Sequence, residues 1–466
     1  MLHADDVIFA PASGNGGAIS VVRVSGAGCL EMLDCIVELR RGSVSSAPGF
    51  SLRYGVVPEL DEVLVSVFRA PHSYTGEDMA EISCHASSYV LTELMGRLSN
   101  AGARLAEPGE FTQRAFLNGK MDLAQAEAVA DLISSASSAQ HRVALNQLKG
   151  GYSAELQQIR AELLELTALM ELELDFSEED VEFADRGRLS ALLDSAIASC
   201  TALAASFRVG NAIRNGVPVA IIGAPNSGKS TLLNALLNDD RAIVSDIPGT
   251  TRDTVEETCV IDGVMFRFID TAGIRNATDE IERLGIERTH RKAAEAEIVL
   301  GLVDLSGTCT WEQFKQAAES IAQMVDLSRQ KLIILANKAD LAPCNKNVID
   351  LNIFVSCADN KHHTADILPI SAKTGLGLEE LRSHLVSASG IASANGTLVT
   401  NARHAAALRA TAAALESVRS GLASSTPTDL LSEDLRAALE HLGTITGAIT
   451  TDETLGEIFK RFCVGK

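Results

Sequence analysis

The run GAPNSGKS at residues 223–230 is the most restrictive feature of the sequence. It follows an apolar run, a pattern that predicts a buried strand, a glycine-rich turn and the start of a helix. Gly223 and Gly228 let the turn bring its backbone N–H groups close around a phosphate, and Lys229 would reach the β- and γ-phosphates. The Ser230 hydroxyl would coordinate Mg²⁺. The chain is therefore expected to contain an α/β unit with this loop at the carboxyl end of a strand.

Three further motifs follow the loop in order: DTAG begins at Asp270, NKAD at Asn337 and SAK at Ser371. The loop alone indicates only that a nucleoside triphosphate binds. NKAD narrows the base to guanine, because the Asp340 carboxylate can accept hydrogen bonds from both the N1–H and the exocyclic amine of guanine, a donor pair that adenine lacks. Together the four motifs predict a guanine-nucleotide (G) domain that binds GTP.

Residues in and between these motifs are candidates for nucleotide and metal contacts. Asp270 is expected to hold Mg²⁺ through a water, and the Gly273 N–H can sense the γ-phosphate. In PGTTRD (248–253), Thr251 is the best candidate for a threonine ligand of Mg²⁺, and Thr250 is its competitor. The other predicted nucleotide contacts are Asn226, Ser227, Gly228, Lys229, Ser230, Thr231, Thr271, Ala272, Asn337, Lys338, Asp340, Ser371, Ala372 and Lys373.

Ile274 directly follows DTAG, where many small GTPases carry the glutamine that orients the attacking water. An isoleucine cannot hydrogen-bond water, so another residue must do so. Glu280, Glu282 and Glu287 are the nearest candidates, although a single glutamate in such a run is more often part of a solvated helix face.

Phosphoryl transfer also needs a cation near the bond between the β- and γ-phosphates, which an arginine often supplies. Arg252 and Arg275 are two candidates for this role. Asn226 offers a third solution, because its side-chain oxygen could hold a monovalent cation in that place. The chemistry of these residues does not by itself select one of the three.

Composition limits the class of protein. A chain of 466 residues is long enough for about three domains. Forty basic against 61 acidic residues argue against a general polyanion binder, although a local RNA-binding surface remains compatible with this balance. The sequence shows neither a signal peptide nor a transmembrane run, so no membrane partner is expected. Nine cysteines without a CxxC pair fit a reducing cytoplasm.

The pattern of residues divides the chain into four segments. Residues 1–119 mix short β-rich runs with a helical run and predict an α+β domain. Residues 120–215 predict long helices, because apolar residues recur there at steps of three and four. Residues 216–389 alternate strands and helices, and residues 390–466 are helical again. The clearest apolar stripe consists of Leu156, Ile159, Leu163, Leu166 and Met170.

We therefore expect a multidomain α+β protein. An N-terminal α+β domain would precede a discontinuous helical domain, into which an α/β P-loop G domain with a mostly parallel sheet is inserted. Residues 122–148 are expected to be helical and the acidic run 172–187 to separate two helices. The polar stretch 341–370 is expected to be a surface insertion.

The motifs PNSGKS, PGTTRD and DTAGIR, with an ending FCVGK, resemble those of the MnmE (TrmE) family of tRNA-modification GTPases. The resemblance covers the whole chain. It includes YTGED at 74–78 and RLAEPGEFTQRAFLNGKMDLAQAEAVADLI at 104–133. The run CHASSYV (84–90), where the family usually has HGG, and PASGNGG (11–17) near the start depart from the family pattern, and both flank the expected folate pocket.

The resemblance implies a potassium-dependent GTPase whose G domains pair across their switch loops, with K⁺ in place of an arginine finger. It implies that Ser230 and Thr251 hold Mg²⁺ and that Glu282 orients the water indirectly. The K⁺ ligands implied are Asn226, Ser245, Ile247 and Thr250, of which Ser245 also counts as a nucleotide contact.

The resemblance also implies partners and a second ligand. A homodimer formed by the N-terminal domain would assemble with an FAD-dependent MnmG-type protein into a heterotetramer. FAD would enter only through that partner. The pair would install a carboxymethylaminomethyl or aminomethyl group on C5 of the wobble uridine of certain tRNAs, with the one-carbon unit from 5-formyl- or methylene-tetrahydrofolate. Cys463 is the candidate for covalent chemistry, with a small packed residue as the alternative role. The implied folate contacts are Arg23, Glu81, Lys120 and Lys466.

Two other functions would also use a G domain. A ribosome-assembly GTPase that also has a hydrophobic residue after DTAG would need a basic RNA-binding domain, which the acidic balance disfavours. A regulatory GTPase would use the G domain only as a switch. In that case replacing Glu282 would leave hydrolysis unchanged.

Overall fold

The computed structural model describes most of the chain, in two compact units. The first unit contains residues 1–130, 147–197 and 410–466, and the second contains residues 131–146 and 198–409. The predicted multidomain α+β fold class is confirmed. The described residues are 6–13, 17–175, 186–237, 257–269, 294–306, 310–341, 353–356, 362–391, 396–424, 426, 428–460, 462 and 464–465.

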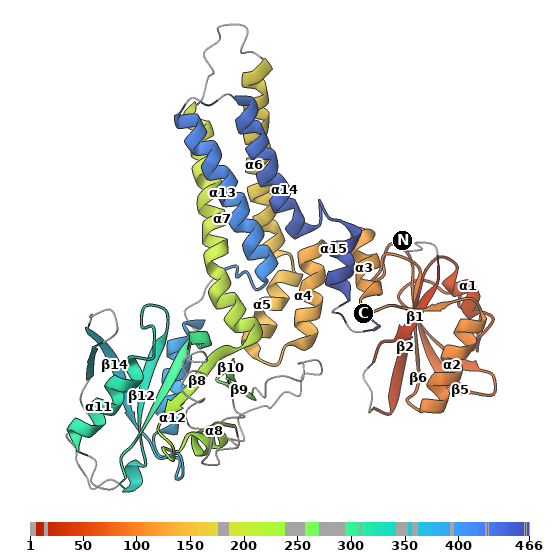
Figure 1. Ribbon diagram of the computed structural model, residues 1–466. Helices are drawn as coiled ribbons and strands as arrows, with labels where there is room; N and C mark the ends of the chain where they lie inside the picture. The colour runs from red at the N-terminus through yellow and green to blue at the C-terminus, as the bar shows by residue number, and fades with distance from the viewer. Residues whose placement is uncertain are drawn as a thin grey trace. The chain divides into compact units, whose positions relative to one another are not determined.

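A seven-stranded sheet forms the N-terminal part of the first unit (Figure 1). Its strand order is β3-β4-β5-β6-β2-β1-β7, with all neighbours antiparallel except β1 and β7. The strands are β1 (Ile8–Pro11), β2 (Ile19–Ser25), β3 (Glu38–Leu39), β4 (Ser51–Val57), β5 (Asp61–Phe68), β6 (Met79–His85) and β7 (Arg104–Leu105).

The two faces of this sheet differ because side chains alternate along each strand. Val22, Val65 and Ile82 are fully buried against the helices α1 (Cys29–Leu33) and α2 (Ser88–Asn100). On the opposite face, Leu52, Tyr54 and Leu64 are exposed on β4 and β5, whereas Ile8 and Ala10 on β1 are buried in a small cluster with Phe111. The first face packs on the core of the domain. We call the second face, which carries Arg23 and Glu81, the presented face.

A buried ionic cluster joins this sheet to α3 (Glu110–Leu117). Glu110 is 1% exposed and accepts hydrogen bonds from Arg104 at 2.7 Å and from Arg114 at 3.1 Å. Arg114 is 5% exposed and also pairs with Asp6 and Glu77. Two buried charges on one helix are tolerated because each has partners of opposite sign.

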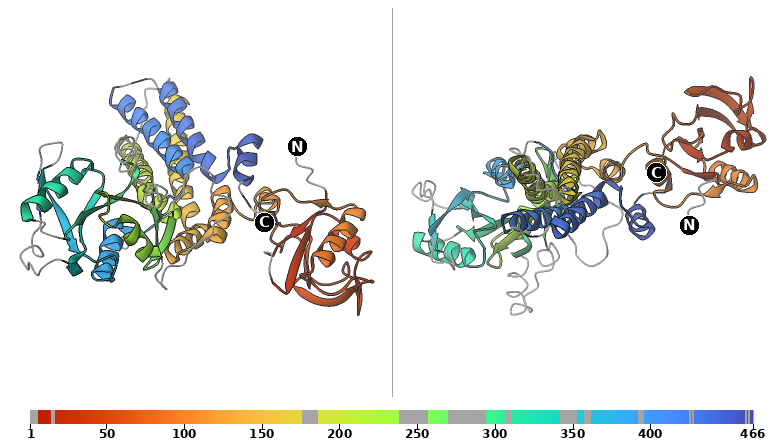
Figure 2. Two further views of the ribbon diagram at one scale, coloured as in Figure 1. Left: turned by 60° about the horizontal axis from the view of Figure 1, so that its bottom comes forward. Right: turned by 90° about the horizontal axis from the view of Figure 1, so that it is seen from above.

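Long helices make up the rest of the first unit. The predicted apolar stripe lies on α6 (Gly151–Asp175), and its five residues are 0–3% exposed. Arg436 of α14 lies 3.6 Å from Glu171 of α6, and α6, α13 and α14 run side by side in both sets of views (Figures 1 and 2). The helices α14 (Thr428–Thr446) and α15 (Asp452–Phe459) lie wholly in this unit. It also contains residues 123–130 of α4 (Leu123–Ser134), 186–197 of α7 (Arg186–Asn215) and 410–423 of α13 (Ala402–Ala423).

One of these helices, over Gly187–Asn215, is long and apolar enough to cross a membrane by length and composition alone. A single helix of this kind is weak support for a membrane span, because core helices of non-membrane proteins meet the same criterion. Leu189, Leu193 and Ala196 are buried within the first unit.

The second unit contains another seven-stranded sheet, with strand order β13-β14-β12-β11-β8-β10-β9. Its inner neighbours are parallel, and only β13 with β14 and β10 with β9 are antiparallel. The strands are β8 (Val217–Gly223), β9 (Glu257–Ile261), β10 (Val264–Phe268), β11 (Ile298–Asp304), β12 (Lys331–Asn337), β13 (Ile353–Ser356) and β14 (His362–Pro369).

Helices cover both faces of this sheet. The helices α8 (Lys229–Leu237) and α12 (Leu378–Ser389) pack on one face, and α11 (Trp311–Ala322) packs on the other. Buried strands between two helical layers are typical of a doubly wound α/β fold, in which ligands bind at the carboxyl ends of the parallel strands. The short helix η1 (Ala339–Leu341) lies directly after β12.

Two predictions need adjustment. The helical stretch 122–148 is two helices, because α4 ends at Ser134 and α5 (Ser138–Leu148) begins after a short break. The expectation that 341–370 is a surface insertion is wrong for its last part. There β14 pairs with β12 inside the sheet, and Leu368 and Ile370 are buried. The polar histidines and threonine at the start of β14 conceal the strand in the sequence.

The turn between β9 and β10 packs against the start of α5, within the second unit. Gly263 occupies the turn with φ 79°, and its carbonyl accepts the backbone N–H of Ala139 at 3.2 Å. A Cβ at Gly263 would lie 2.2 Å from the Ser138 Oγ. Only glycine fits this backbone conformation at this separation.

Candidate functional site

The predicted phosphate loop joins β8 to α8 at the carboxyl end of β8, an inner strand that lies between β11 and β10. Gly223 is close-packed, since a Cβ there would lie 2.5 Å from the carbonyl oxygen of Leu302. Gly228 has φ 104° and Asn226 has φ 61°, a left-handed conformation that asparagine tolerates better than most residues. Asn226 is exposed, so its side chain is free to meet a ligand.

Asn337 links the loop to two other motifs. Its Nδ2 donates to the carbonyl of Ser227 at 2.7 Å, and its Oδ1 accepts the backbone N–H of Ala372 at 3.1 Å. The side chain is 2% exposed. A Cβ at Gly228 would lie 2.3 Å from the same Nδ2, so the glycine lets the two segments approach. The structure thus brings the GAPNSGKS, NKAD and SAK segments together.

Lys229 and Ser227 are suited to an anionic ligand. The Lys229 Nζ donates to the carbonyls of Gly223 and Ala224, each at 2.9 Å. Burial lowers the pKa of the Lys229 ammonium, because the low-dielectric surroundings disfavour its charge. Within the described residues, the buried Ser227 Oγ has no hydrogen-bond partner. A bound phosphate would supply a negative charge beside the Lys229 ammonium and oxygen atoms that accept a hydrogen bond from the Ser227 hydroxyl.

Beside the loop lie the residues predicted to read the base. Lys338 has φ 63°, and its Nζ pairs with the Asp304 Oδ2 at 2.6 Å. Asp340 is exposed in η1, where its carboxylate is accessible. Ser371 is buried, and its Oγ accepts the backbone N–H of Thr374 at 3.2 Å. Lys373 and Thr231 are exposed, and Ser230 is half-buried at the start of α8.

The remaining predicted residues of the nucleotide site, the two terminal candidates and the open alternatives lie outside the described residues. They are Ser245, Ile247, Thr250, Thr251, Arg252, Asp270, Thr271, Ala272, Gly273, Ile274, Arg275, Glu280, Glu282, Glu287, Cys463 and Lys466.

A second site is a cavity of about 420 Å³ on the presented face of the N-terminal sheet. Three of the four residues predicted to bind folate line it together: Arg23, Glu81 and Lys120. The Lys120 Nζ donates to the carbonyl of Pro71 at 2.9 Å. The other lining residues are Phe50, Phe68, His72, Ser73, Tyr74 and Met79.

The Arg23 side chain in this cavity contacts a carboxylate, two aromatic rings and a backbone carbonyl. Its Nε and Nη2 donate to the Glu81 Oε1 at 3.0 and 2.8 Å, as the cross-strand register of β2 and β6 dictates. The guanidinium lies 5.1 Å from the ring centre of Tyr74 and 5.6 Å from that of Phe111, within cation–π range. Its Nη1 donates to the carbonyl of Gly465 at 3.3 Å. Arg23 therefore couples the cavity wall to the C-terminal segment.

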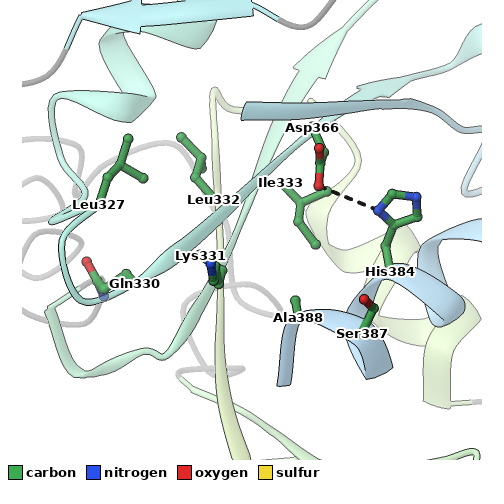
Figure 3. Close-up of a pocket in the computed structure, with 9 residues that line it drawn as sticks. All are labelled: Leu327, Gln330, Lys331, Leu332, Ile333, Asp366, His384, Ser387 and Ala388. Atoms are coloured by element: carbon green, nitrogen blue, oxygen red, sulfur yellow. Dashed lines mark ion pairs between the residues drawn. The ribbon is translucent and has the colours of Figure 1, made fainter. Parts of the chain in front are cut away.

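A second cavity, of about 440 Å³, lies in the second unit at the amino end of β12 (Figure 3). Lys331, Asp366 and His384 line it, with 3.7 Å between the last two. Because Lys331 begins β12 and Asn337 ends it, this cavity is at the opposite edge of the sheet from the phosphate loop. It is not part of the nucleotide site.

Sequence reasoning missed two groups of residues. Asp304 ends the apolar strand 298–304, and a polar residue at that position of a parallel sheet is a signal that could have been read. The aromatic residues around Arg23 gave no signal of their own. Tyr74 lies inside the quoted motif YTGED, but its contact with Arg23 depends on the pairing of distant strands.

Comparisons with known proteins agree across the chain. Residues 7–120 match the family described as GTP-binding protein TrmE N-terminus, and residues 123–463 match the MnmE helical domain. A tRNA modification GTPase MnmE of Bacteroides thetaiotaomicron is 49% identical, with 99% of each chain covered. A protein of the same name from Parabacteroides distasonis is 48% identical over 97% of each chain, and one from Christiangramia forsetii is 46% identical over 100% of each.

Proposed function

Because the chain belongs to the MnmE family of tRNA modification GTPases, we propose that it hydrolyses GTP and acts in tRNA modification. The observation that carries GTP binding is the buried Asn337 amide, which joins the phosphate loop to the base-reading segments. We propose four segments: an N-terminal domain (1–119), the first half of the helical domain (120–215), the G domain (216–389) and the second half of the helical domain (390–466).

In this proposal the phosphate loop binds GTP through its backbone N–H groups and Lys229, and Asp340 selects guanine. Ser230 and Thr251 would hold Mg²⁺, with Asp270 contacting it through water. When bound, Mg²⁺ supplies positive charge to the phosphate oxygens. The unpartnered Ser227 Oγ and the partly buried Lys229 support this assignment, because both are polar groups that an anionic ligand would satisfy.

Potassium is proposed as the cation that replaces an arginine finger. Asn226 would contribute its side-chain oxygen, and its exposure and left-handed backbone support that role. Ser245, Ile247 and Thr250 would complete the ligand set. Bound K⁺ would neutralise charge near the β–γ bridge, and Glu282 would orient the attacking water.

A reduced folate, 5-formyl- or methylene-tetrahydrofolate, is proposed as the ligand of the N-terminal cavity. The volume of about 420 Å³ lies within the range of small-molecule sites. Lys120 suits a glutamate tail, Glu81 can accept from a pterin edge, and the aromatic side chains suit a flat ring. Arg23 and Lys466 complete the proposed contacts.

Homodimerisation is proposed through the presented face of the N-terminal sheet. Leu52, Tyr54 and Leu64 are 61%, 43% and 42% exposed there. Tyr54 and Leu64 are direct cross-strand partners, so they form one apolar patch on paired strands. An exposed apolar patch of this kind is typical of a protein interface.

The proposed chemistry is the addition of a carboxymethylaminomethyl or aminomethyl group to C5 of the wobble uridine of certain tRNAs. An FAD-dependent MnmG-type partner would join the homodimer in a heterotetramer, and Cys463 would serve as the nucleophile candidate. The reaction would take place in the cytoplasm, where tRNA is available.

Nucleoside mass spectrometry of total tRNA tests this function. In cells that lack the gene, the C5-modified wobble uridines should disappear, and they should return with the wild-type gene but not with Lys229→Ala. Unchanged uridines would redirect the search to a ribosome-assembly or regulatory GTPase. Purified protein should hydrolyse GTP faster in K⁺ than in Na⁺, and Asn226→Ala should remove that difference.

A further inference from the structure

The lysine of the NKAD motif is held by a carboxylate from the neighbouring strand. Asp304 ends β11 and is the register partner of Asn337, which ends β12. The Asp304 Oδ2 lies 2.6 Å from the Nζ of Lys338. Both side chains are 31% exposed, so the pair lies at the rim of the site, where a ligand can reach it.

Asp304 is fixed independently of the lysine. Its Oδ1 accepts the backbone N–H of Ser306 at 2.8 Å, and the N–H of Leu305 donates to the Asn337 carbonyl at 2.9 Å. Burial raises the pKa of the Asp304 carboxyl, but the hydrogen bonds from Lys338 and Ser306 outweigh burial and leave that pKa below its ordinary value. A negative charge at a fixed place thus faces Lys338 at neutral pH.

Lys338 is constrained at its other end as well. Its φ of 63° is uncommon for a residue with a side chain and costs energy unless the surroundings enforce it. The backbone N–H of the neighbouring Ala339 donates to the carbonyl of Ile370 at 3.0 Å, and the Leu341 N–H donates to the Lys338 carbonyl at 2.9 Å. The lysine is therefore fixed by its backbone at one end and by Asp304 at the other.

We propose that Asp304 is a positioning residue for guanine-nucleotide binding, which holds Lys338 so that its aliphatic stem forms a wall for the purine between Asn337 and Asp340. A free lysine samples many rotamers, and ordering it before the ligand arrives removes that cost from binding. This inference rests on the proposed GTP binding.

An ordinary surface ion pair is the competing explanation. Such pairs contribute little to folding, because solvent screens them and their side chains lose rotamer freedom. On that explanation, removing the Asp304 charge changes stability slightly and leaves nucleotide affinity as it was. The two explanations therefore differ in what happens to the dissociation constant for GDP.

The test compares full-length wild type with Asp304→Asn and Asp304→Ala, using a fluorescent GDP analogue and steady-state GTP hydrolysis. We expect the Kd for GDP to rise by about five- to tenfold, mainly through faster dissociation. KM for GTP should rise with it, while kcat at saturating GTP stays at the wild-type value. Preference for GDP over IDP should be unchanged, since Asp340 reads the exocyclic amine.

Asp326→Asn is the matched control. Asp326 also accepts the backbone N–H two residues later, from Ser328 at 3.1 Å, but its side chain pairs with that serine and not with a lysine. It tests whether loss of such a turn is enough to weaken binding. Its Kd for GDP should equal that of wild type.

A double-mutant cycle with Lys338→Met tests whether Asp304 acts through the lysine. Methionine keeps an apolar stem and removes the charge. If the proposal is right, Asp304→Asn has no further effect on Kd in the Lys338→Met background. An unchanged or lower Kd in Asp304→Asn, or additive effects in the cycle, would overturn it. Failure of the wild type to bind GDP would instead overturn the GTP-binding function itself.

Discussion

The Asn337 side chain donates to the main-chain carbonyl of Ser227, 110 residues earlier in the chain, at a distance of 2.7 Å. The same amide accepts the N–H of Ala372, so one buried group joins the three segments proposed to bind different parts of a nucleotide. Its role is structural before any ligand arrives. Stability and affinity should therefore depend on it together.

Asn337→Ala should weaken both properties. It leaves the Ser227 carbonyl and the Ala372 N–H without their partner, and a buried unsatisfied group costs about 1–3 kcal/mol. We expect the free energy of unfolding of the second unit to fall by roughly 3 kcal/mol and the affinity for GDP to fall at least about tenfold. Calorimetry without nucleotide and titration with GDP measure the two effects. The exposed Asn215→Ala is the control, and an Asn337→Ala protein with wild-type stability would contradict the prediction.

The free energy of unfolding of the first unit should depend on pH because Glu110 titrates. Burial raises the pKa of the Glu110 carboxyl, but hydrogen bonds from Arg104, the Glu107 N–H and Arg114 outweigh it and hold that pKa below the ordinary 4.5. Because the folded-state pKa is depressed, the stabilisation is complete above pH about 4.5 and is lost as the pH falls through the folded-state value.

Glu110→Gln measures this contribution. It should lower the free energy of unfolding by about 3 kcal/mol at pH 7, because it leaves buried Arg114 short of a charged partner. The difference from wild type in urea unfolding should shrink as the pH falls below the ordinary glutamate value. Glu93→Gln, whose partner Arg97 lies one helical turn away at the surface, should differ from wild type by less than about 0.5 kcal/mol at any pH. A constant Glu110→Gln difference across this range would exclude titration of Glu110 as its cause.

Lys120→Met should weaken folate binding. The Lys120 ammonium lines the N-terminal cavity and is hydrogen-bonded to a neutral carbonyl, so it can exchange that partner for a carboxylate of the ligand. We expect the Kd for 5-formyltetrahydrofolate to rise by about tenfold, with a weaker dependence on salt. Isothermal titration calorimetry gives both quantities. Lys149→Met, exposed and outside the cavity, should bind as wild type does, and equal behaviour of the two variants would remove Lys120 from the ligand set.

Gly263→Ala should destabilise the second unit. The new Cβ adopts a φ that costs an L-residue about 1–2 kcal/mol, and it lies 2.2 Å from the Ser138 Oγ. The double variant Gly263→Ala with Ser138→Ala removes the close contact and should recover part of the loss in thermal unfolding. Gly390→Ala, at φ 66° with open space around it, reports the backbone strain alone. Equal losses at Gly263 and Gly390 would show that contact with α5 adds nothing.

The parts of the G domain that could be predicted are those that depend on residues close together in the sequence. Each apolar run that a motif terminates is a strand, as β8 and β12 show, because buried parallel strands lack polar alternation. The apolar stripe of α6 could also be predicted, since residues such as Leu163 and Leu166 recur at helical spacing and are buried together. Order and spacing therefore gave the fold class.

Contacts between distant segments could not be predicted in the same way. Asp304 meets Lys338 only because β11 and β12 pair in one register, and the sequence between them does not encode that alignment locally. The strand β14 was missed because its polar residues resemble a loop until β12 is placed beside it. The rings of Tyr74 and Phe111 likewise acquire a role only once they lie on Arg23.

The hydrogen bond from Arg23 to Gly465 spans 442 residues of chain. A Cβ at Gly465 would lie 2.1 Å from the Pro11 carbonyl oxygen, so this segment also packs tightly against β1. Chains are synthesised from the amino end, and early domains generally fold as they emerge. The N-terminal sheet can therefore form during translation, but its ligand cavity acquires this wall contact only after the helices and the whole G domain have been made. A nascent chain that stalls within the G domain would carry a folded sheet and an unfinished cavity.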